Sequence, residues 1–363
     1  MRGETKKQST MLSLRTPEER VPADHPLRRV KDLADGALAM LSGTFDAMYS
    51  QQGRPSIPPE QLLKASLLMA FYSVRSERLF CEQLDYNLLF RWFLDMGIED
   101  ASFDHSTFSA NRQRLLEHEV AKRFFAAVVE QARKGRLMSD DHFSVDGSLI
   151  EAWASLKSFR PKDEDKDKRK PPDDPGNPSV NFRGEKRSNE THESKTDPDS
   201  RLARKGLGKE ARLAYSANAL MENRNGLLVD LLVEPADGYA ERRAAVTMLR
   251  ALAQKKRITV GADKGYDVKS FIEGCRELGV TPHVAQTSDY HRRSAVDRRT
   301  VRHIGYVASQ RVRKRIEEIF GWMKTVGGFR RTRYRGRDRT QLAAYFVGAA
   351  YNLLRMARLQ PVA

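Results

Sequence analysis

Cysteine is scarce in this sequence, with only Cys81 and Cys275 among 363 residues. Each lies among apolar residues at helical spacing, where a free, buried thiol is the usual outcome. No Cys-X-X-Cys pair and no zinc-type Cys/His spacing is present. Disulfide bridges are therefore not expected, which favours a reducing cytosol.

Long hydrophobic runs are also absent. The longest, Leu342–Leu354, is shorter than the roughly 20 apolar residues that cross a bilayer. Met1–Arg20 is polar and charged and lacks the apolar centre of a signal peptide. We expect a soluble, cytoplasmic protein.

Acidic residues are outnumbered. The chain has 48 Asp and Glu against 64 Lys and Arg, which gives a net charge of +16 and a pI of about 9.8. The basic surplus is spread over several segments. Such a balance points to a polyanionic partner, most simply nucleic acid.

One stretch lacks large apolar residues almost entirely. Pro161–Ser200 holds six prolines, and Val180 and Phe182 are its only large apolar side chains. Because this composition cannot bury a core, we expect a disordered insertion at residues 157–205. The polar residues 1–25 are expected to form a flexible lead-in.

Helical periodicity dominates residues 26–136, and it predicts an all-helical N-terminal domain. Within it, Asp104–Arg114 reads as a capped helix start, with Asn111, Arg112 and Arg114 expected to face outward. Short helices joined by tight polar turns fit a helix-turn-helix DNA-binding module. They fit a helical dimerisation bundle equally well, and the spacing does not decide between the two.

After Ser139 the pattern changes to alternating strands and helices, which indicates an α/β domain at residues 139–360 with a mixed sheet covered by helices. The segment HFSVDG reads as a strand that ends in a turn at Asp146-Gly147. Two strand-like runs around Asn225-Gly226 predict a β-hairpin. Further elements are expected at Ala240–Lys255 (helix), Ile258–Ala262 (strand), Val268–Leu278 (helix), Thr281–Ala285 (strand) and Gln341–Leu359 (helix).

The stretch Val307–Arg337 predicts one amphipathic helix, a Gly-Gly break and a run of arginines. Its apolar stripe consists of Ile316, Ile319, Phe320 and Met323. At about 100° per residue, Gln310, Arg313, Glu317 and Lys324 share an arc beside that stripe. A solvated basic helix would explain the charges, but not an acid at the edge of the core.

Three acids occupy positions where a side chain can face a cleft. Asp146 follows a predicted strand, Asp263 follows the strand ITVGA, and Glu317 lies on the helix face just described. Converging carboxylates repel one another unless a cation joins them, and an all-oxygen set selects Mg²⁺ or Mn²⁺. The two aspartates could also be ordinary turn residues, and Glu317 could pair with Arg313.

These motifs resemble a known family. SVDGSLIEAWAS, ITVGADKGYD and SQRVRKRIEEIFGWMKT, in this order, are similar to the three acidic motifs of bacterial insertion-sequence transposases of the IS4/IS5 type. Arg313, Glu317 and Lys324 fit the family's Tyr-Arg-Glu-Lys spacing, with Gln310 at the tyrosine position. The segments GRPSIPPEQLLKASLLMA, FDHSTFSANRQRL and SKTDPDSRLARKG also resemble the IS5 family.

The resemblance implies an RNase H-like catalytic domain behind the helical one, with Asp146, Asp263 and Glu317 as ligands of two Mg²⁺ ions, for which Mn²⁺ can substitute. It implies DNA contacts by six cationic residues (Arg313, Lys324, Arg330, Arg331, Arg333 and Arg335). The expected partners are terminal inverted repeats and target DNA, bound by a homodimer or larger assembly near the bacterial nucleoid. The rival functions are an RNase H-like nuclease without strand transfer and a transposase-derived DNA-binding protein.

Overall fold

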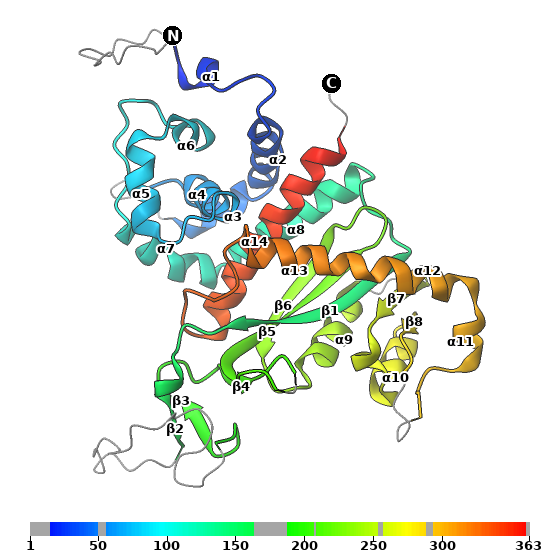
Figure 1. Cartoon of the computed structure of the whole chain (residues 1–363). Coiled ribbons are helices and arrows are strands. Elements are labelled where there is room, and N and C mark those ends of the chain that lie inside the picture. The colour runs from blue at the N-terminus through cyan, green and yellow to red at the C-terminus, as the bar shows by residue number, and fades with distance from the viewer. Residues whose placement is uncertain are drawn as a thin grey trace, which may run out of the picture.

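The computed structural model describes residues 15–49, 56–162, 187–206, 208–252, 257–287 and 293–360. Helices precede the first long strand, which confirms the helical N-terminal region (Figure 1). These helices are α1 (Pro17–Arg20), α2 (Leu27–Ala39), α3 (Ser42–Met48), α4 (Pro59–Phe71), α5 (Glu77–Tyr86), α6 (Leu88–Phe93), α7 (Ser106–Glu117) and α8 (Val120–Lys134).

The remaining elements include the predicted strands and helices in the predicted order, with further short strands and helices between them. They are β1 (His142–Glu151), the 3-10 turn η1 (Leu156–Ser158), β2 (Phe159–Pro161), β3 (His192–Ser194), β4 (Arg201–Ala203), β5 (Arg212–Glu222), β6 (Leu228–Pro235), α9 (Ala240–Leu252), β7 (Ile258–Ala262), η2 (Lys264–Tyr266), α10 (Lys269–Glu277), β8 (Val280–Val284), α11 (Arg298–Arg302), α12 (Ile304–Val312), η3 (Arg313–Arg315), α13 (Ile316–Lys324) and α14 (Arg337–Leu359). None of the described helices is long and apolar enough to cross a membrane.

The sheet is mixed, with β6 and β4 pairing one edge of β5, followed by β1, β7 and β8. β5 runs antiparallel to β1 and β6, whereas β7 and β8 run parallel to β1. The hairpin between β5 and β6 turns at Gly226, whose φ of +70° is a conformation that glycine adopts without strain. This arrangement confirms the expected RNase H-like sheet flanked by helices.

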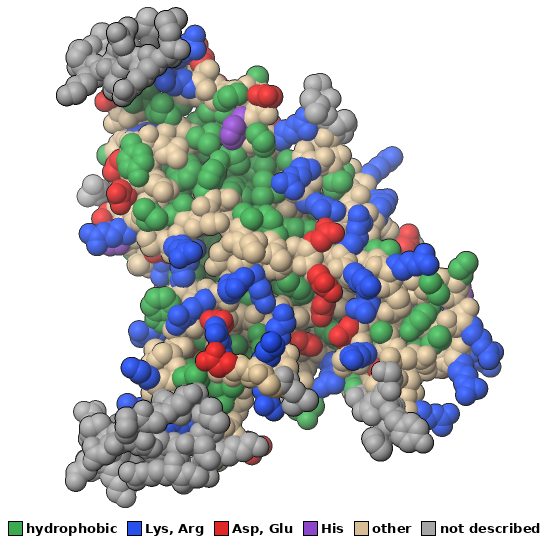
Figure 2. All heavy atoms as spheres, in the orientation of Figure 1, with side chains coloured by type: hydrophobic (Ala, Val, Ile, Leu, Met, Phe, Trp, Pro, Cys, Tyr) green, Lys and Arg blue, Asp and Glu red, His purple; other side chains and the backbone are tan. Residues whose placement is uncertain are grey.

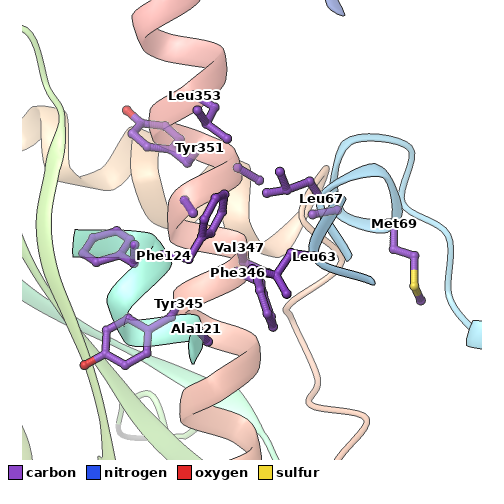
Figure 3. Packing of buried hydrophobic residues seen from close by; sticks show 14 of the residues in the cluster. Leu63, Leu67, Met69, Ala121, Phe124, Tyr345, Phe346, Val347, Tyr351 and Leu353 are labelled. Carbon is purple, nitrogen blue, oxygen red and sulfur yellow. The ribbon is translucent and has the colours of Figure 1, made fainter. Parts of the chain in front are cut away.

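Two hydrophobic clusters lie on the two sides of the sheet. The smaller packs α9 and α10 against β1, β7 and β8. The larger is centred on α14 and contains residues of β5, β6, α13, α8 and the N-terminal helices. In Figure 3, Tyr345, Phe346 and Val347 of α14 lie between α8 and the α4 residues Leu63 and Leu67. The helical region and the sheet therefore share one core.

The outer edge of β6 is closed by side chains of α14. The Asn352 amide accepts a hydrogen bond from the Leu228 N–H at 2.8 Å and donates one to the Leu228 carbonyl at 2.7 Å. Gln341 accepts a hydrogen bond from Val233 N–H at 2.6 Å and donates to the Leu231 carbonyl at 2.8 Å. An exposed strand edge invites pairing with other chains, and these two amides satisfy its backbone groups.

The disorder expected at residues 157–205 is not found in the described part of that segment. Residues 157–162 and 187–205 contain β2, β3 and β4. Asp197, which is buried, accepts hydrogen bonds from the Tyr215 hydroxyl at 2.6 Å and the Gly336 N–H at 3.1 Å. Hydrogen bonds to the buried Asp197 thus help to hold in place a segment that is poor in apolar residues. Residues 163–186, and 1–14 of the expected lead-in, lie outside the described residues.

The outward-facing set predicted on α7 is wrong. Asn111 is buried, and its side chain donates a hydrogen bond to the Thr107 carbonyl. Arg112 forms an ion pair with Glu77 and lies over the Tyr334 ring, and Arg114 lies over the Tyr49 ring. These polar side chains join helices within the chain, so they no longer support a helix-turn-helix DNA contact.

Candidate active site

The site lies where strands β1 and β7 part. Their pairing ends at Ser144 and Gly261, whereas β1 continues to Glu151 because β5 pairs with it along its whole length. The predicted turn at Asp146-Gly147 is therefore wrong, since both residues lie within β1. Asp146 lies on the part of β1 that has lost its β7 neighbour, so its backbone edge is open there.

Asp263 directly follows β7 and reaches the same opening. It is the residue before the 3-10 turn η2, and its carboxylate accepts a hydrogen bond from the Gly265 N–H at 2.8 Å. The sequence pattern placed this acid correctly at the end of a parallel strand. A short strand followed by a capped turn fixes its position.

Asp146 has an unusual electrostatic environment. Its carboxyl pKa is raised to about 7, mainly by burial. The negative charges of Asp263 and Glu241 contribute to this rise, whereas the hydrogen bond from the Gly147 N–H at 2.8 Å and the positive charge of Arg313 oppose it. The structure therefore brings Asp146 and Asp263 together as a partly desolvated pair of like charges, the arrangement that a cation would relieve.

Glu241 is a member of this group that the sequence analysis missed. It stands in the first turn of α9, and its side chain lies against Gly147. A Cβ atom at position 147 would come within 2.7 Å of the Glu241 Oε1. Burial raises the pKa of Glu241, and the charge of Asp263 raises it further. In the sequence this residue looks like an ordinary acid in a helix first turn, so nothing local marks it.

Glu317 lies on α13, beyond a break that the sequence did not predict. The expected single helix is α12, the 3-10 turn η3 and α13 in succession. The predicted apolar stripe of α13 is buried, and Glu317 is exposed. As the side chains stand, no three His, Cys, Asp or Glu residues within the described ranges form a group that could hold a metal ion. Asp146 and Asp263 thus lie close enough for their charges to interact, whereas the convergence of all three acids stays a prediction.

Gln310, at the position where the family pattern has tyrosine, fixes Arg313. Its amide donates a hydrogen bond to the His283 carbonyl of β8 at 2.7 Å and accepts one from Arg313 Nε at 2.8 Å. Arg313 also packs close to Gly261 of β7. The glutamine therefore holds the guanidinium at the end of β7, near Asp146.

Lys324, at the C-terminal end of α13, contacts β1, the strand that carries Asp146. Its Nζ donates a hydrogen bond to the Ser148 hydroxyl at 2.5 Å. Ser148 and Asp146 share one face of β1 because side chains alternate along a strand. Burial lowers the Lys324 pKa, as do Lys205 and Arg330. Of the two cations that bracket Glu317 in the sequence, Lys324 thus contacts β1 and Arg313 lies at the end of β7.

The four predicted arginines after the Gly-Gly break divide into two pairs. Arg331 donates hydrogen bonds to the Ala152 and Trp153 carbonyls at 3.1 and 2.7 Å, and Arg333 donates to the Val74 carbonyl at 3.1 Å. The exposed guanidinium groups of Arg330 and Arg335 have no hydrogen bond or ion pair with any described residue. Arg330 and Arg335 are therefore free to meet a ligand, whereas Arg331 and Arg333 hold the fold together.

The surface around the site carries charge of both signs. In the orientation of Figure 1, acidic side chains gather near the middle of the molecule and lysine and arginine side chains flank them (Figure 2). An acidic centre inside a basic surround can hold cations at the centre and phosphates at the rim.

Comparison with known families gives two matches in chain order. Residues 15–114 match the Transposase domain (DUF772), and residues 180–353 match the Transposase DDE domain. The second match contains Asp263 and Glu317 and begins after β1, so Asp146 lies outside it. No curated protein matches the sequence.

Some solved structures are similar at low identity. A piggyBac transposase synaptic complex with hairpin DNA is 10% identical, with 91% of this chain and 73% of that chain covered and a TM-score of 0.40. A pre-cleavage Mos1 transpososome is 11% identical, with 85% and 82% covered and a TM-score of 0.21. The assignment therefore rests on the two family matches, which together show that this chain belongs to the DDE transposases.

Proposed function

We propose that this protein is the transposase of an insertion sequence. It binds the terminal inverted repeats of its element, hydrolyses the phosphodiester bond at each end and joins the freed 3′-hydroxyl to target DNA. The observation that supports the proposal is that Asp146 lies on β1 just beyond its pairing with β7, that Asp263 directly follows β7, and that the Asp263 charge raises the Asp146 pKa. The family matches supply the class of reaction.

The donor chemistry of the site fits a divalent cation. The groups at the opening are carboxylates, partly desolvated and mutually repelling, and they are the hard oxygen ligands that Mg²⁺ and Mn²⁺ prefer. Asp146 and Asp263 would hold the cation, and Glu317 is the third acid that the motif spacing offers from α13. A bound pair of such ions would activate the attacking oxygen and stabilise the leaving oxygen.

The chain's own cations would hold the DNA backbone. Arg313 and Lys324 contact the β1–β7 region on either side of Glu317, at hydrogen-bonding distance from Gln310 and Ser148 respectively. They would place the scissile phosphate over Asp146. The exposed Arg330 and Arg335 would contact further phosphates along the DNA backbone. Two element ends must be handled together, which suits a dimer or larger assembly on DNA.

The test uses the full chain with labelled duplexes that carry the two DNA ends flanking this coding sequence. With Mg²⁺ or Mn²⁺, we expect cleaved ends and products in which a labelled end is joined to a target duplex. Asp146→Asn and Asp263→Asn should lower the cleavage rate by at least about a hundredfold and retain DNA binding. The acids take part in the reaction, whereas the cationic residues bind the DNA. Asp46→Asn, an exposed position on α3, is the matched control.

The outcomes separate the candidate functions. Cleavage without joined products would indicate an RNase H-like nuclease. Binding without cleavage by the wild-type chain would indicate a DNA-binding derivative. Full activity in both aspartate variants would show that the proposed site is wrong.

A further inference from the structure

The proposed reaction leaves unused a group of side chains that packs around Gly147. Glu241 lies directly over this glycine, which follows Asp146 on the part of β1 that no longer pairs with β7. Arg242, its neighbour on α9, donates a hydrogen bond to the Gly265 carbonyl at 3.3 Å. That contact ties the start of α9 to the turn that carries Asp263, so Glu241 is held beside the site.

Glu241 has no structural partner to explain its position. It forms no ion pair and no hydrogen bond with any residue in the described ranges, although it is largely buried and faces the negative charge of Asp263. An acid that only capped α9 would be better placed in solvent. Its site on Gly147 also requires that residue 147 have no side chain, since a Cβ there would collide with the glutamate.

Tyr266 provides an independent observation at the same place. Its side chain is fully buried and packs on the Phe271 ring, with the ring centroids 5.0 Å apart. Its hydroxyl has no hydrogen-bond partner among the described residues. Burial raises the pKa of this hydroxyl, and the negative charges of Glu241, Asp146 and Asp263 also raise it. A buried hydroxyl without a hydrogen-bond partner is rare in folded proteins.

We propose that Glu241 is a further acidic residue of the catalytic site, which binds the divalent cation together with Asp146 and Asp263, and that Tyr266 positions Glu241 through a hydrogen bond. The proposal rests on the proposed function, since it deepens the same site. The negative charges of Asp263 and Glu241 both raise the Asp146 pKa, and a cation bound among the three carboxylates would relieve that repulsion. The Tyr266 hydroxyl would then have a carboxylate oxygen within reach.

The experiment compares Glu241→Gln and Tyr266→Phe with wild type, with Glu277→Gln on the exposed end of α10 as the matched control. Mn²⁺ binding is measured from the electron paramagnetic resonance of the free ion, and the Tm is measured in excess chelator. We expect Glu241→Gln and Tyr266→Phe to weaken Mn²⁺ binding by about tenfold or more. In chelator, their Tm should equal or exceed the wild-type value, because one variant removes a repelling charge and the other an unpaired hydroxyl.

Each outcome bears on the proposal. A lower Tm in chelator with unchanged Mn²⁺ binding would make Glu241 purely structural and overturn it. Unchanged Mn²⁺ binding at any Tm would also overturn it. Asp146→Asn, measured in the same way, distinguishes a failure of the Glu241 proposal from a failure of the proposed cation site. If that variant loses Mn²⁺ and Glu241→Gln does not, only this inference fails, and if neither loses Mn²⁺, the proposed cation site itself fails.

Discussion

At the residue scale, motif spacing predicted the acids of the candidate site and did not predict the elements that hold them. Asp146 and Asp263 were found because acids after strands are conspicuous in a sequence. Glu241 could not be found in this way, because its role depends on β1, α9 and η2 meeting in space. Arg331 and Arg333 show the opposite error, since basic residues look alike in a sequence whether they bind a ligand or backbone carbonyls.

Gln310 shows how a departure from a family pattern can still serve the site. An amide has both a donor and an acceptor, so one side chain can bind the β8 backbone and the Arg313 guanidinium together. A tyrosine hydroxyl could accept from the arginine, but its ring would need more space. The sequence alone could not show whether Gln310 loses the contact that the family's tyrosine makes or replaces it with another.

A pH prediction concerns the buried His283 and the half-buried His142, which lie beneath α12. The Ser309 hydroxyl lies 2.6 Å from His283 Nδ1 and 2.8 Å from His142 Nε2. Burial, together with the neighbouring histidines His142 and His303, lowers the His283 pKa to about 4. Between about pH 6.5 and 4 the unfolded chain therefore binds more protons, so stability should fall as the pH falls through this window.

The measurement is urea unfolding at several pH values for wild type and His283→Asn, whose amide can keep the contact with Ser309 without titrating. The variant should lose roughly 1–3 kcal/mol less stability than wild type between pH 6.5 and 4. His105→Asn, at a half-exposed position, should keep the wild-type slope. Equal slopes for wild type and His283→Asn would contradict the prediction.

At the element scale, helices with a clear apolar face were predicted well and interruptions were not. The start of α9 at Ala240, the span of α10 and the hairpin at Gly226 all agree with the sequence. The 3-10 turn η3 was missed because it preserves the direction of the helix while changing its hydrogen bonds. The predicted strand ended too early, at Asp146-Gly147, because Asp-Gly is typical of turns. In the structure, pairing with β5 keeps both residues within β1.

A stability prediction follows from the closure of β6. Asn352 is fully buried and satisfies both backbone groups of Leu228. Asn352→Leu should lower the free energy of unfolding by about 2–4 kcal/mol, because it leaves a buried N–H and a buried carbonyl unpaired. Urea unfolding checks this, with Arg339→Leu on the exposed face of α14 as the control. If the two variants had equal stability, the edge would not depend on this amide.

At the scale of the whole molecule, the sequence predicted two domains but not their shared core. Periodicity assigns α14 to the catalytic region, because it follows that region in the chain. Its apolar side chains in fact surround the whole helix and meet α4, α2 and α8 as well as β6. Only the three-dimensional contacts show that the last helix joins the first part of the chain to the sheet (Figures 1 and 3).

The shared core predicts that the helical region and the sheet unfold together. Variants that retain only Trp92 on α6 or only Trp322 on α13 report on the two parts by fluorescence, and their urea midpoints should coincide. Leu353→Ala, at a fully buried position on α14, should lower both midpoints by the same amount, equivalent to about 2–5 kcal/mol. Separate midpoints, or a shift confined to one reporter, would mean that the two parts fold independently. Coincident midpoints would mean that α14 couples the helical region to the strands that carry Asp146 and Asp263, so that DNA bound by one part can be held in register with the acids of the other.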